Sequence, residues 1–196
     1  MSSSFTRDEV EQAFRTYYMT GPVMEDWASW AHLFVDDAVY REHFWGTFHG
    51  PDEIQTWVEG AMAAVPHIYT PLKWYVIDGD RCVYEVENWA DNPEPGGAPI
   101  GFPSVQVVQY AGEGKWRSEE DWWVLPEARR AAEQYAAATA AHDPEFASKL
   151  TRDDWGSWVD WARPPAGEHA APSWLGRGDV KPVLRPRDLT VGIRNP

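Results

Sequence analysis

The apolar residues of this chain change their spacing near residue 66, and that change limits the folds that the chain can adopt. Upstream, apolar residues recur at the three- and four-residue spacing of helices. Downstream, apolar and polar residues alternate, which is typical of strands buried on one face. The alternating segments are 68–78, 81–90, 102–111 and 114–125. Four such segments joined by turns predict an antiparallel meander after a helical region, an α+β arrangement.

Three helices are expected upstream of the strands. Thr6 and Glu9 form a capping box that starts the first helix, and Gly21-Pro22 ends it. The second helix carries apolar residues on one side: Trp27, Trp30, Ala31 and Phe34. Gly50-Pro51 opens the third helix, because proline suits the first helical position. A short strand over 38–43 is expected between the second and third helices, followed by a second short strand or a turn over 44–49.

The residues after the strands form an extension. An alanine-rich helix is expected from Pro126 to about Ala141, and a short helix over 151–163. The chain is then rich in Pro, Gly and Arg, which predicts an extended arm. Such an arm is either a loose end or a strap over a pocket mouth or a partner subunit. We divide the chain into a domain over 1–148 and a C-terminal extension over 149–196.

The charge of the chain restricts its partners. The 196 residues include 17 Lys and Arg against 31 Asp and Glu, a formal net charge of −14. This balance argues against nucleic acid or an anionic membrane, because binding to phosphates needs clustered cations. The single cysteine excludes an internal disulfide, and the N-terminus has no apolar leader, so we expect a soluble cytoplasmic protein. Without a phosphate-binding Gly-rich loop or a metal-binding motif, we expect neither a nucleotide cofactor nor a metal.

Several stretches resemble a known family. They are WAHLFVDDAVY at residues 30–40, GTFHGPDEI at residues 46–54, and the later GKWRSEEDWW. With the order of elements, they look like the SnoaL-like branch of the nuclear transport factor 2-like superfamily, over about residues 5–140. The resemblance implies a curved antiparallel sheet and three helices that enclose a cone-shaped apolar pocket. The superfamily includes polyketide cyclases, ketosteroid isomerases, scytalone and bile-acid dehydratases, limonene epoxide hydrolases and non-catalytic binding modules.

The stretch KWRSEEDWW places three carboxylates in a row. In a strand, Arg117, Glu119, Asp121 and Trp123 share one face, and Trp116, Ser118, Glu120 and Trp122 share the other. Alternation does not say which face is buried. The resemblance implies that Asp121 takes the position of the catalytic aspartate of SnoaL-like cyclases and epoxide hydrolases. An apolar pocket would raise the pKa of Asp121 and suit it to move protons, whereas a solvated strand edge is the alternative.

Glu42 is the second catalytic candidate. By the resemblance it lies where ketosteroid isomerases have their general-base carboxylate and where epoxide hydrolases have a water-binding amide. If Glu42 faces Asp121 across the pocket, one acts as base and the other as acid; an exposed strand glutamate is the alternative. Tyr40 shares the face of Glu42, while His43 points the other way unless a bulge intervenes. His43 is also a catalytic candidate, with a packed histidine as the alternative.

His67 lies, by the same resemblance, where scytalone and bile-acid dehydratases have a proton-handling histidine. The second histidine of the scytalone enzymes has no counterpart, because Pro103 stands there, and a solvent-facing His67 is the alternative. Isomerases and dehydratases bind a substrate oxygen with a tyrosine on the first helix, and Tyr17 and Tyr18 resemble it; core tyrosines are the alternative. The substrate-binding candidates are Tyr17, Tyr18, Tyr40, Asn88, Trp30 and Trp123.

The resemblance implies a cofactor-free enzyme, a dehydratase, isomerase or cyclase, that acts next to a carbonyl or hydroxyl of a hydrophobic cyclic substrate. The 13 tryptophans suit the walls of such a pocket. A non-catalytic ligand-binding or dimerisation module is the alternative, and an epoxide hydrolase is a second one. The epoxide hydrolase is weakened, because Val86 and Asn88 stand where those enzymes have Arg and Asp. A homodimer formed through the outer face of the sheet is expected in each case.

Overall fold

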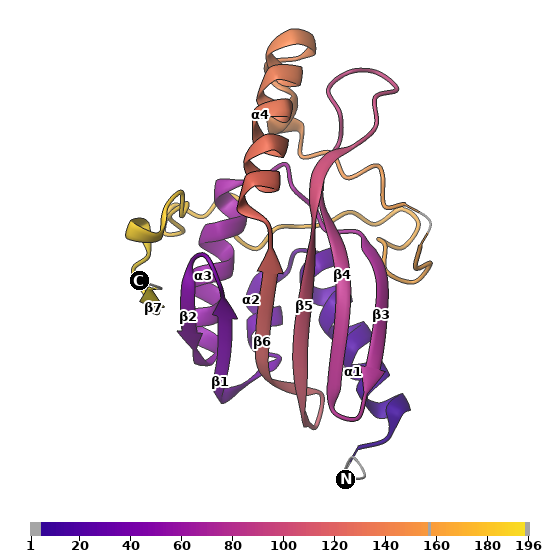
Figure 1. The fold of residues 1–196 in the computed structure, drawn as a ribbon, viewed down its shortest axis with the longest axis vertical. Helices are drawn as coiled ribbons and strands as arrows, with labels where there is room; N and C mark the ends of the chain where they lie inside the picture. Colours follow the sequence, from indigo (N-terminus) through magenta and orange to yellow (C-terminus); the bar gives the residue numbers. More distant parts are fainter. Residues whose placement is uncertain (1–4, 157, 195–196) are drawn as a thin grey trace.

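The computed structural model describes residues 5–156 and 158–194, the side chain of Arg194 excepted. A seven-stranded sheet runs through the molecule, and the N-terminal helices lie on one of its faces (Figure 1). The strand order is β3–β4–β5–β6–β1–β2–β7. The strands are β1 (Phe34–Glu42), β2 (Gly46–His49), β3 (Leu72–Asp78), β4 (Arg81–Ala90), β5 (Ile100–Gly112), β6 (Lys115–Trp123) and β7 (Ile193–Arg194). The α-helices are α1 (Arg7–Tyr18), α2 (Trp27–Ala31), α3 (Gly50–Ala64) and α4 (Leu125–His142). The predicted α+β class is confirmed.

Strands β3 to β6 form the predicted antiparallel meander. The expectation of a wholly antiparallel sheet is wrong at one place, because β1 runs parallel to β6. The chain leaves β2 through α3, on the helical face, and enters β3 at the opposite edge of the sheet (Figure 1). The meander then returns strand by strand, and its last strand comes to lie beside β1 in the same direction.

The helices begin where the sequence predicts but differ in length. The Glu9 amide donates a hydrogen bond to Thr6 Oγ1 at 3.2 Å, so Thr6 caps α1 as predicted. Gly21-Pro22 does not end the helical path, which continues as a π-helical turn over Met19–Val23. The α2 helix is shorter than expected, and Phe34 already begins β1. None of the helices in the described part of the chain combines the length and apolarity that crossing a membrane requires.

The predicted helix over 151–163 is wrong. Its described residues follow an irregular path. The Asp153 amide donates to Asp91 Oδ2 at 2.9 Å, and the Asp154 amide donates to the Tyr69 hydroxyl at 3.1 Å. Because these amides bond to the body of the protein, they are not available for a helical ladder. Long-range contacts thus override the helical pattern of the segment.

Two arginines of the extension reach buried glutamates of the body. Arg152, whose side chain is 10% exposed, donates to both carboxylate oxygens of Glu25, whose side chain is 2% exposed. Arg177 donates to both oxygens of Glu59, at 3.0 and 3.2 Å, and Glu59 is also buried. A buried carboxylate without a partner destabilises a fold strongly, so both ion pairs tie the extension to the body.

The extension then passes along α3 to the far edge of the sheet (Figure 1). The Val183 amide donates to the carbonyl oxygen of Gly60 in α3 at 2.9 Å. A Cβ atom at Gly60 would lie 2.8 Å from a Val183 methyl group, so glycine permits this close contact. Strand β7 pairs with β2 and ends the described chain. The extension therefore packs against α3 and β2 of the same chain.

Replacing Arg152 by alanine should lower the free energy of unfolding by about 3–5 kcal/mol, the range for breaking a buried ion pair from one side. Burial raises the pKa of Glu25, and Arg152 opposes that rise. Without Arg152 the pKa rises further, so the loss should be larger near pH 8 than near pH 5, where Glu25 takes up a proton.

Urea unfolding at both pH values measures this effect. Arg185→Ala is the matched control, because Arg185 pairs with Asp188 on the surface. It should change the free energy of unfolding by less than about 1 kcal/mol. Equal losses in the two variants would contradict the anchoring role of Arg152.

Candidate active site

A cavity of about 550 Å³ lies between the inner face of the sheet and the helices. Strands β1, β4, β5 and β6 form one wall, and α1, α2, α3 and α4 contribute the others. Val183 and the exposed Leu184 bring the extension to the cavity rim. The tryptophans of the wall are Trp27, Trp30, Trp45, Trp57 and Trp123. The cavity is therefore an apolar pocket rich in aromatic rings, of the size that small-molecule sites have.

Pairing between strands arranges the polar groups of the wall in rows. Gln106 of β5 lies opposite Asp121 of β6, and Asp121 lies opposite Glu42 of β1. The adjacent row places Glu119 of β6 opposite Tyr40 of β1. All five residues line the cavity. The face that Glu119 and Asp121 share is therefore the inner one.

Glu119 is buried, with 4% of its surface exposed. The Tyr17 hydroxyl donates to its Oε2 at 2.6 Å, and the Tyr84 hydroxyl donates to its Oε1 at 3.3 Å. Burial raises the pKa of Glu119 well above its ordinary value, the charge of Asp121 raises it further, and the tyrosine hydrogen bonds oppose the rise. Glu119 therefore keeps its proton to a higher pH than an ordinary glutamate does.

Asp121 lies beside Glu119 on the inner face of β6, and its two carboxylate oxygens have different surroundings. The Tyr40 hydroxyl donates to Oδ2 at 2.5 Å. Oδ1 is shielded from solvent and accepts no hydrogen bond from the described residues. Burial raises the pKa of Asp121 to about 7, the Tyr40 hydrogen bond opposes this rise, and the charge of Glu42 adds to it. Near neutral pH Asp121 thus exists in both protonation states, as a group that moves protons must.

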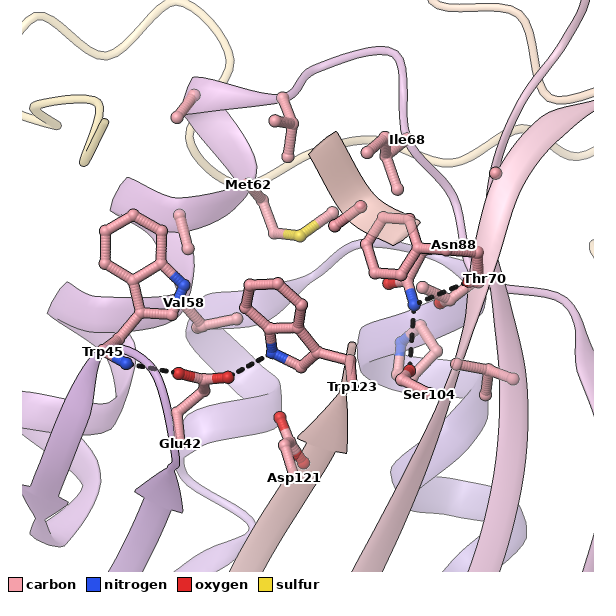
Figure 2. Close-up of a pocket in the computed structure, with 18 of the residues that line it drawn as sticks. Glu42, Trp45, Val58, Met62, Ile68, Thr70, Asn88, Ser104, Asp121 and Trp123 are labelled. Atoms are coloured by element: carbon pink, nitrogen blue, oxygen red, sulfur yellow. Dashed lines mark hydrogen bonds between the residues drawn. The ribbon is translucent and has the colours of Figure 1, made fainter. Parts of the chain in front are cut away.

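Glu42 is surrounded by donors. Figure 2 shows Glu42 and Asp121 on neighbouring strands, with the Trp123 indole close to both. Oε2 accepts from the amides of Phe44 at 2.9 Å and Trp45 at 2.5 Å, and Oε1 accepts from the indole N–H of Trp123. Burial raises the pKa of Glu42, and these hydrogen bonds oppose the rise. Because donors occupy both oxygens, Glu42 is less suited than Asp121 to take a proton from a substrate.

An amide cluster on β4 and β5 lies beside the acids. Asn88 Nδ2 donates to Ser104 Oγ at 2.9 Å (Figure 2). Gln106 Nε2 donates to the same oxygen at 2.6 Å. Gln106 is 8% exposed, and its Oε1 has no hydrogen-bond partner among the described residues. Such a buried acceptor is costly unless a ligand or water supplies a donor.

His67 lines the cavity near α4. Its ring stacks on Tyr135, with ring centroids 4.2 Å apart. Burial and, to a smaller extent, the charge of Arg152 lower the pKa of His67 to about 4. His67 is therefore neutral at neutral pH and brings no positive charge to the cavity.

Two of the candidate residues do not line the cavity. His43 lies on the outer face, where its Nε2 is 2.8 Å from Glu120 Oε1 and its ring stacks on Trp122. Tyr18 is buried elsewhere, and its hydroxyl donates to the carbonyl oxygen of Thr70 at 2.5 Å. These positions correct the expectation that His43 and Tyr18 act on a ligand, because neither side chain reaches the cavity.

The other candidates line the cavity: Asp121, Glu42, His67, Tyr17, Tyr40, Asn88, Trp30 and Trp123. Sequence reasoning missed further polar residues of its wall: Glu119, Tyr84, Gln106, Ser104, Thr70 and Tyr135. Glu119 could have been found, because strand alternation already groups it with Asp121. The placement of Trp116 on the opposite face is wrong, because the register shifts at Arg117 and turns Trp116 into the core.

The described residues contain no candidate metal site with three or more ligands. No cluster of three or more His, Cys, Asp or Glu side chains there has the arrangement to hold a metal ion. Cys82 is fully buried, and burial raises the pKa of its thiol. Cys82 is therefore a packed core residue rather than a reactive thiolate.

Comparison with known proteins identifies the fold. A family model described as a SnoaL-like domain matches residues 14–119. A search of curated proteins finds no match. The region that matches the family ends within β6, so Asp121, α4 and the extension lie beyond it.

Solved structures resemble the chain at low sequence identity. A protein with a ketosteroid isomerase-like fold from Catenulispora acidiphila, in complex with trimethylamine, is 19% identical, with a TM-score of 0.51; the match covers 67% of this chain and 98% of that one. An LEH-like epoxide hydrolase from M. tuberculosis is 14% identical, with a TM-score of 0.53 and coverage of 68% and 96%. A protein named as a SnoaL-like polyketide cyclase from Jannaschia is 14% identical, with a TM-score of 0.53 and coverage of 67% and 95%. At these identities the likeness concerns the fold.

The pKa of Asp121 should be measurable as about 7 by carbon NMR of labelled carboxyl groups, with Asp121→Asn used for assignment. Tyr40→Phe should raise that pKa, because it removes a hydrogen bond to the ionised form. Tyr18→Phe is the matched control, since the Tyr18 hydroxyl bonds to a backbone carbonyl, and it should leave the value unchanged. An Asp121 that titrates near the ordinary value of about 4 would show a solvated carboxylate instead.

Proposed function

Since the chain belongs to the SnoaL-like domain family, we propose that it is a cofactor-free acid–base enzyme that acts next to a carbonyl or hydroxyl group of a hydrophobic cyclic substrate. One observation carries this proposal. Two carboxylic acids, Glu119 and Asp121, lie side by side in an aromatic cavity, and burial raises the pKa of both. Perturbed acids in a cleft are a typical sign of proton-transfer chemistry.

Glu119 and Asp121 have different roles. Asp121 acts as the base, because its pKa of about 7 leaves it partly ionised near neutral pH. Protonated Glu119 remains beside it and, with Tyr40, stabilises the ionised Asp121. This pairing replaces the expected pair of Glu42 and Asp121. Glu42 instead holds the Trp123 indole and raises the pKa of Asp121 through its charge.

The reaction begins with loss of a proton from the carbon next to a carbonyl. Asp121 takes that proton, and the electron pair of the C–H bond moves into an enolate with its charge on the carbonyl oxygen. Return of the proton to another carbon isomerises the substrate. Departure of a neighbouring hydroxyl as water, with the proton from Asp121, dehydrates it. Attack of the enolate carbon on a second carbonyl closes a ring, and the alkoxide that forms takes the proton from Asp121.

The walls supply groups to hold the substrate. The indole N–H groups of Trp27 and Trp30 are buried and have no acceptor among the described residues. Both residues line the cavity, so an indole N–H is available to a substrate oxygen. The apolar rings around them suit a flat cyclic body. Epoxide hydrolysis remains the weaker alternative, because Val86 and Asn88 occupy the inner positions of β4.

The test is exchange of protons next to a carbonyl, which needs no knowledge of the natural product. A panel of cyclic ketones in heavy water is followed by proton NMR with and without the protein. Asp121→Asn should slow the exchange by about 10²–10⁴-fold, the usual contribution of a positioned base. The variant should be more stable than the parent near pH 8, because it removes a buried group whose raised pKa opposes folding at high pH.

Glu120→Gln is the matched control, since Glu120 is the neighbouring acid on the outer face. It should keep both the fold and the exchange rate. If no ketone exchanges, or if Asp121→Asn exchanges as fast as the parent, the chain is better described as a non-catalytic binding module.

We further propose that the outer face of the sheet pairs two copies of the chain. The centre of this face carries Val83, Val105 and Val107 on β4 and β5, with Trp74 and Val76 on β3 and Trp122 on β6. Ion pairs lie beside them: Glu85, bonded to Lys73, is in register with Trp74 and Val105, and Glu120, bonded to Arg41, is in register with Val107. Aromatic side chains are enriched at protein interfaces.

Val107→Asp should convert such a dimer into a monomer, because it places a charge in the apolar centre. Analytical ultracentrifugation measures the mass. Leu175→Asp is the control, since Leu175 is an exposed apolar residue of the extension, and it should not change the mass. A parent protein that sediments as a monomer at all concentrations would refute the interface.

A further inference from the structure

The described lining of the cavity contains three carboxyl groups and no cationic side chain. Glu42, Glu119 and Asp121 all face it, and none of the described residues that line it is a lysine or an arginine. His67 also lines it, but its lowered pKa keeps the ring neutral. The acids therefore have two ways to avoid mutual repulsion: they keep protons, or a ligand brings a positive charge.

The aromatic walls favour a ligand that brings a positive charge. Tryptophan and tyrosine rings attract cations through the negative faces of their π-systems, and tryptophan does so most strongly. Trp45 and Trp123 hydrogen-bond to the carboxylate of Glu42, Tyr40 hydrogen-bonds to Asp121, and Trp57 packs against Trp45 in the same lining. A cation held near these acids would therefore lie among aromatic rings.

Gln106 provides an observation independent of the acids. Its side chain is more than nine-tenths buried, and its amide N–H is already bonded to Ser104. Its Oε1 is left as an acceptor with no donor, and Asp121 Oδ1, on the residue opposite across the sheet, is in the same condition. Glu119 already contributes a hydrogen bond to Asp121, so Gln106 Oε1 is the acceptor that calls for a ligand with a donor. A neutral carbonyl cannot satisfy it.

We propose that the cavity binds an organic ammonium ion, a protonated amine on a flat apolar body, with its N–H groups directed at Asp121 Oδ1 and Gln106 Oε1. The amine charge is balanced by the carboxylates, and the apolar body lies against the tryptophans. This inference deepens the proposed function, on whose cavity it rests, by naming the charge of the substrate. It does not depend on turnover.

Binding of such a cation depends on pH. The titratable groups on the inner face beside Asp121 are Glu119 on its own strand, Tyr40 and Glu42 on β1, and Tyr84 on β4 next to Glu119, while Glu120 acts on it only through its charge from the outer face. All are acids, so a cation stabilises the ionised form of Asp121 and lowers its pKa. Affinity for the amine should therefore rise as the pH rises through about 7.

The test compares two isosteric probes by isothermal titration calorimetry on the full chain. Naphthylmethylamine is protonated near pH 8, and naphthylmethanol has the same shape and a hydroxyl donor but no charge. The amine should bind at least about tenfold more tightly than the alcohol near pH 8, which is about 1.4 kcal/mol. The difference should shrink near pH 5, while the alcohol should show little dependence on pH.

Variants test which side chains cause the preference for the amine. Asp121→Asn should abolish the preference for the amine, and Gln106→Leu should reduce it several-fold while leaving every carboxylate in place. Glu120→Gln removes the same charge from the outer face and should keep the preference. An alcohol that binds as tightly as the amine near pH 8, or a preference that survives Asp121→Asn, would overturn the proposal. Ketone proton exchange with no preference for the amine would overturn this inference alone and leave the proposed function standing.

Discussion

The parallel pairing of β1 with β6 is the contact on which the cavity depends. It sets Glu42 opposite Asp121 and brings Tyr40 to the carboxylate of Asp121, although these residues lie about eighty positions apart in the chain. The pairing exists because α3 carries the chain to the far edge of the sheet before the meander begins. A hairpin order of strands would have left the two acids on separate parts of the sheet.

The acids of the cavity oppose the stability that the aromatic core provides. Burial raises the pKa of Glu42, Glu119 and Asp121, so each favours the unfolded state as the pH rises. The hydroxyls of Tyr17 and Tyr40 lessen this cost without removing it. A cluster that costs stability and is held in place by tyrosines agrees with a functional role, since sites often conflict with optimal folding.

The extension is part of the same fold rather than an addition to it. Glu25 and Glu59 lie buried in the body, and the extension supplies the arginines that neutralise them. Arg152 has a second effect, because its charge helps to keep His67 neutral at the cavity wall. The segment that ties down the chain thus also contributes to the electrostatics of the cavity.

The sequence by itself determined the local features of this protein. The change of period predicts helices before strands, Thr6 marks the first helix, and alternation groups Glu119 with Asp121. Those features depend on neighbours within a few residues, which the sequence displays directly. Family resemblance added Asp121 and Glu42 as candidates, and both lie at the cavity.

Only the tertiary structure decided which face of each strand is buried. Strand alternation is symmetric, so it could not say that Asp121 points inward while His43 points outward. The register shift beside Trp116 and the irregular path of 151–163 also depend on partners far away in the chain. The physical reason is that burial and ion pairing are contacts between distant segments, and a local pattern contains no record of which segments meet.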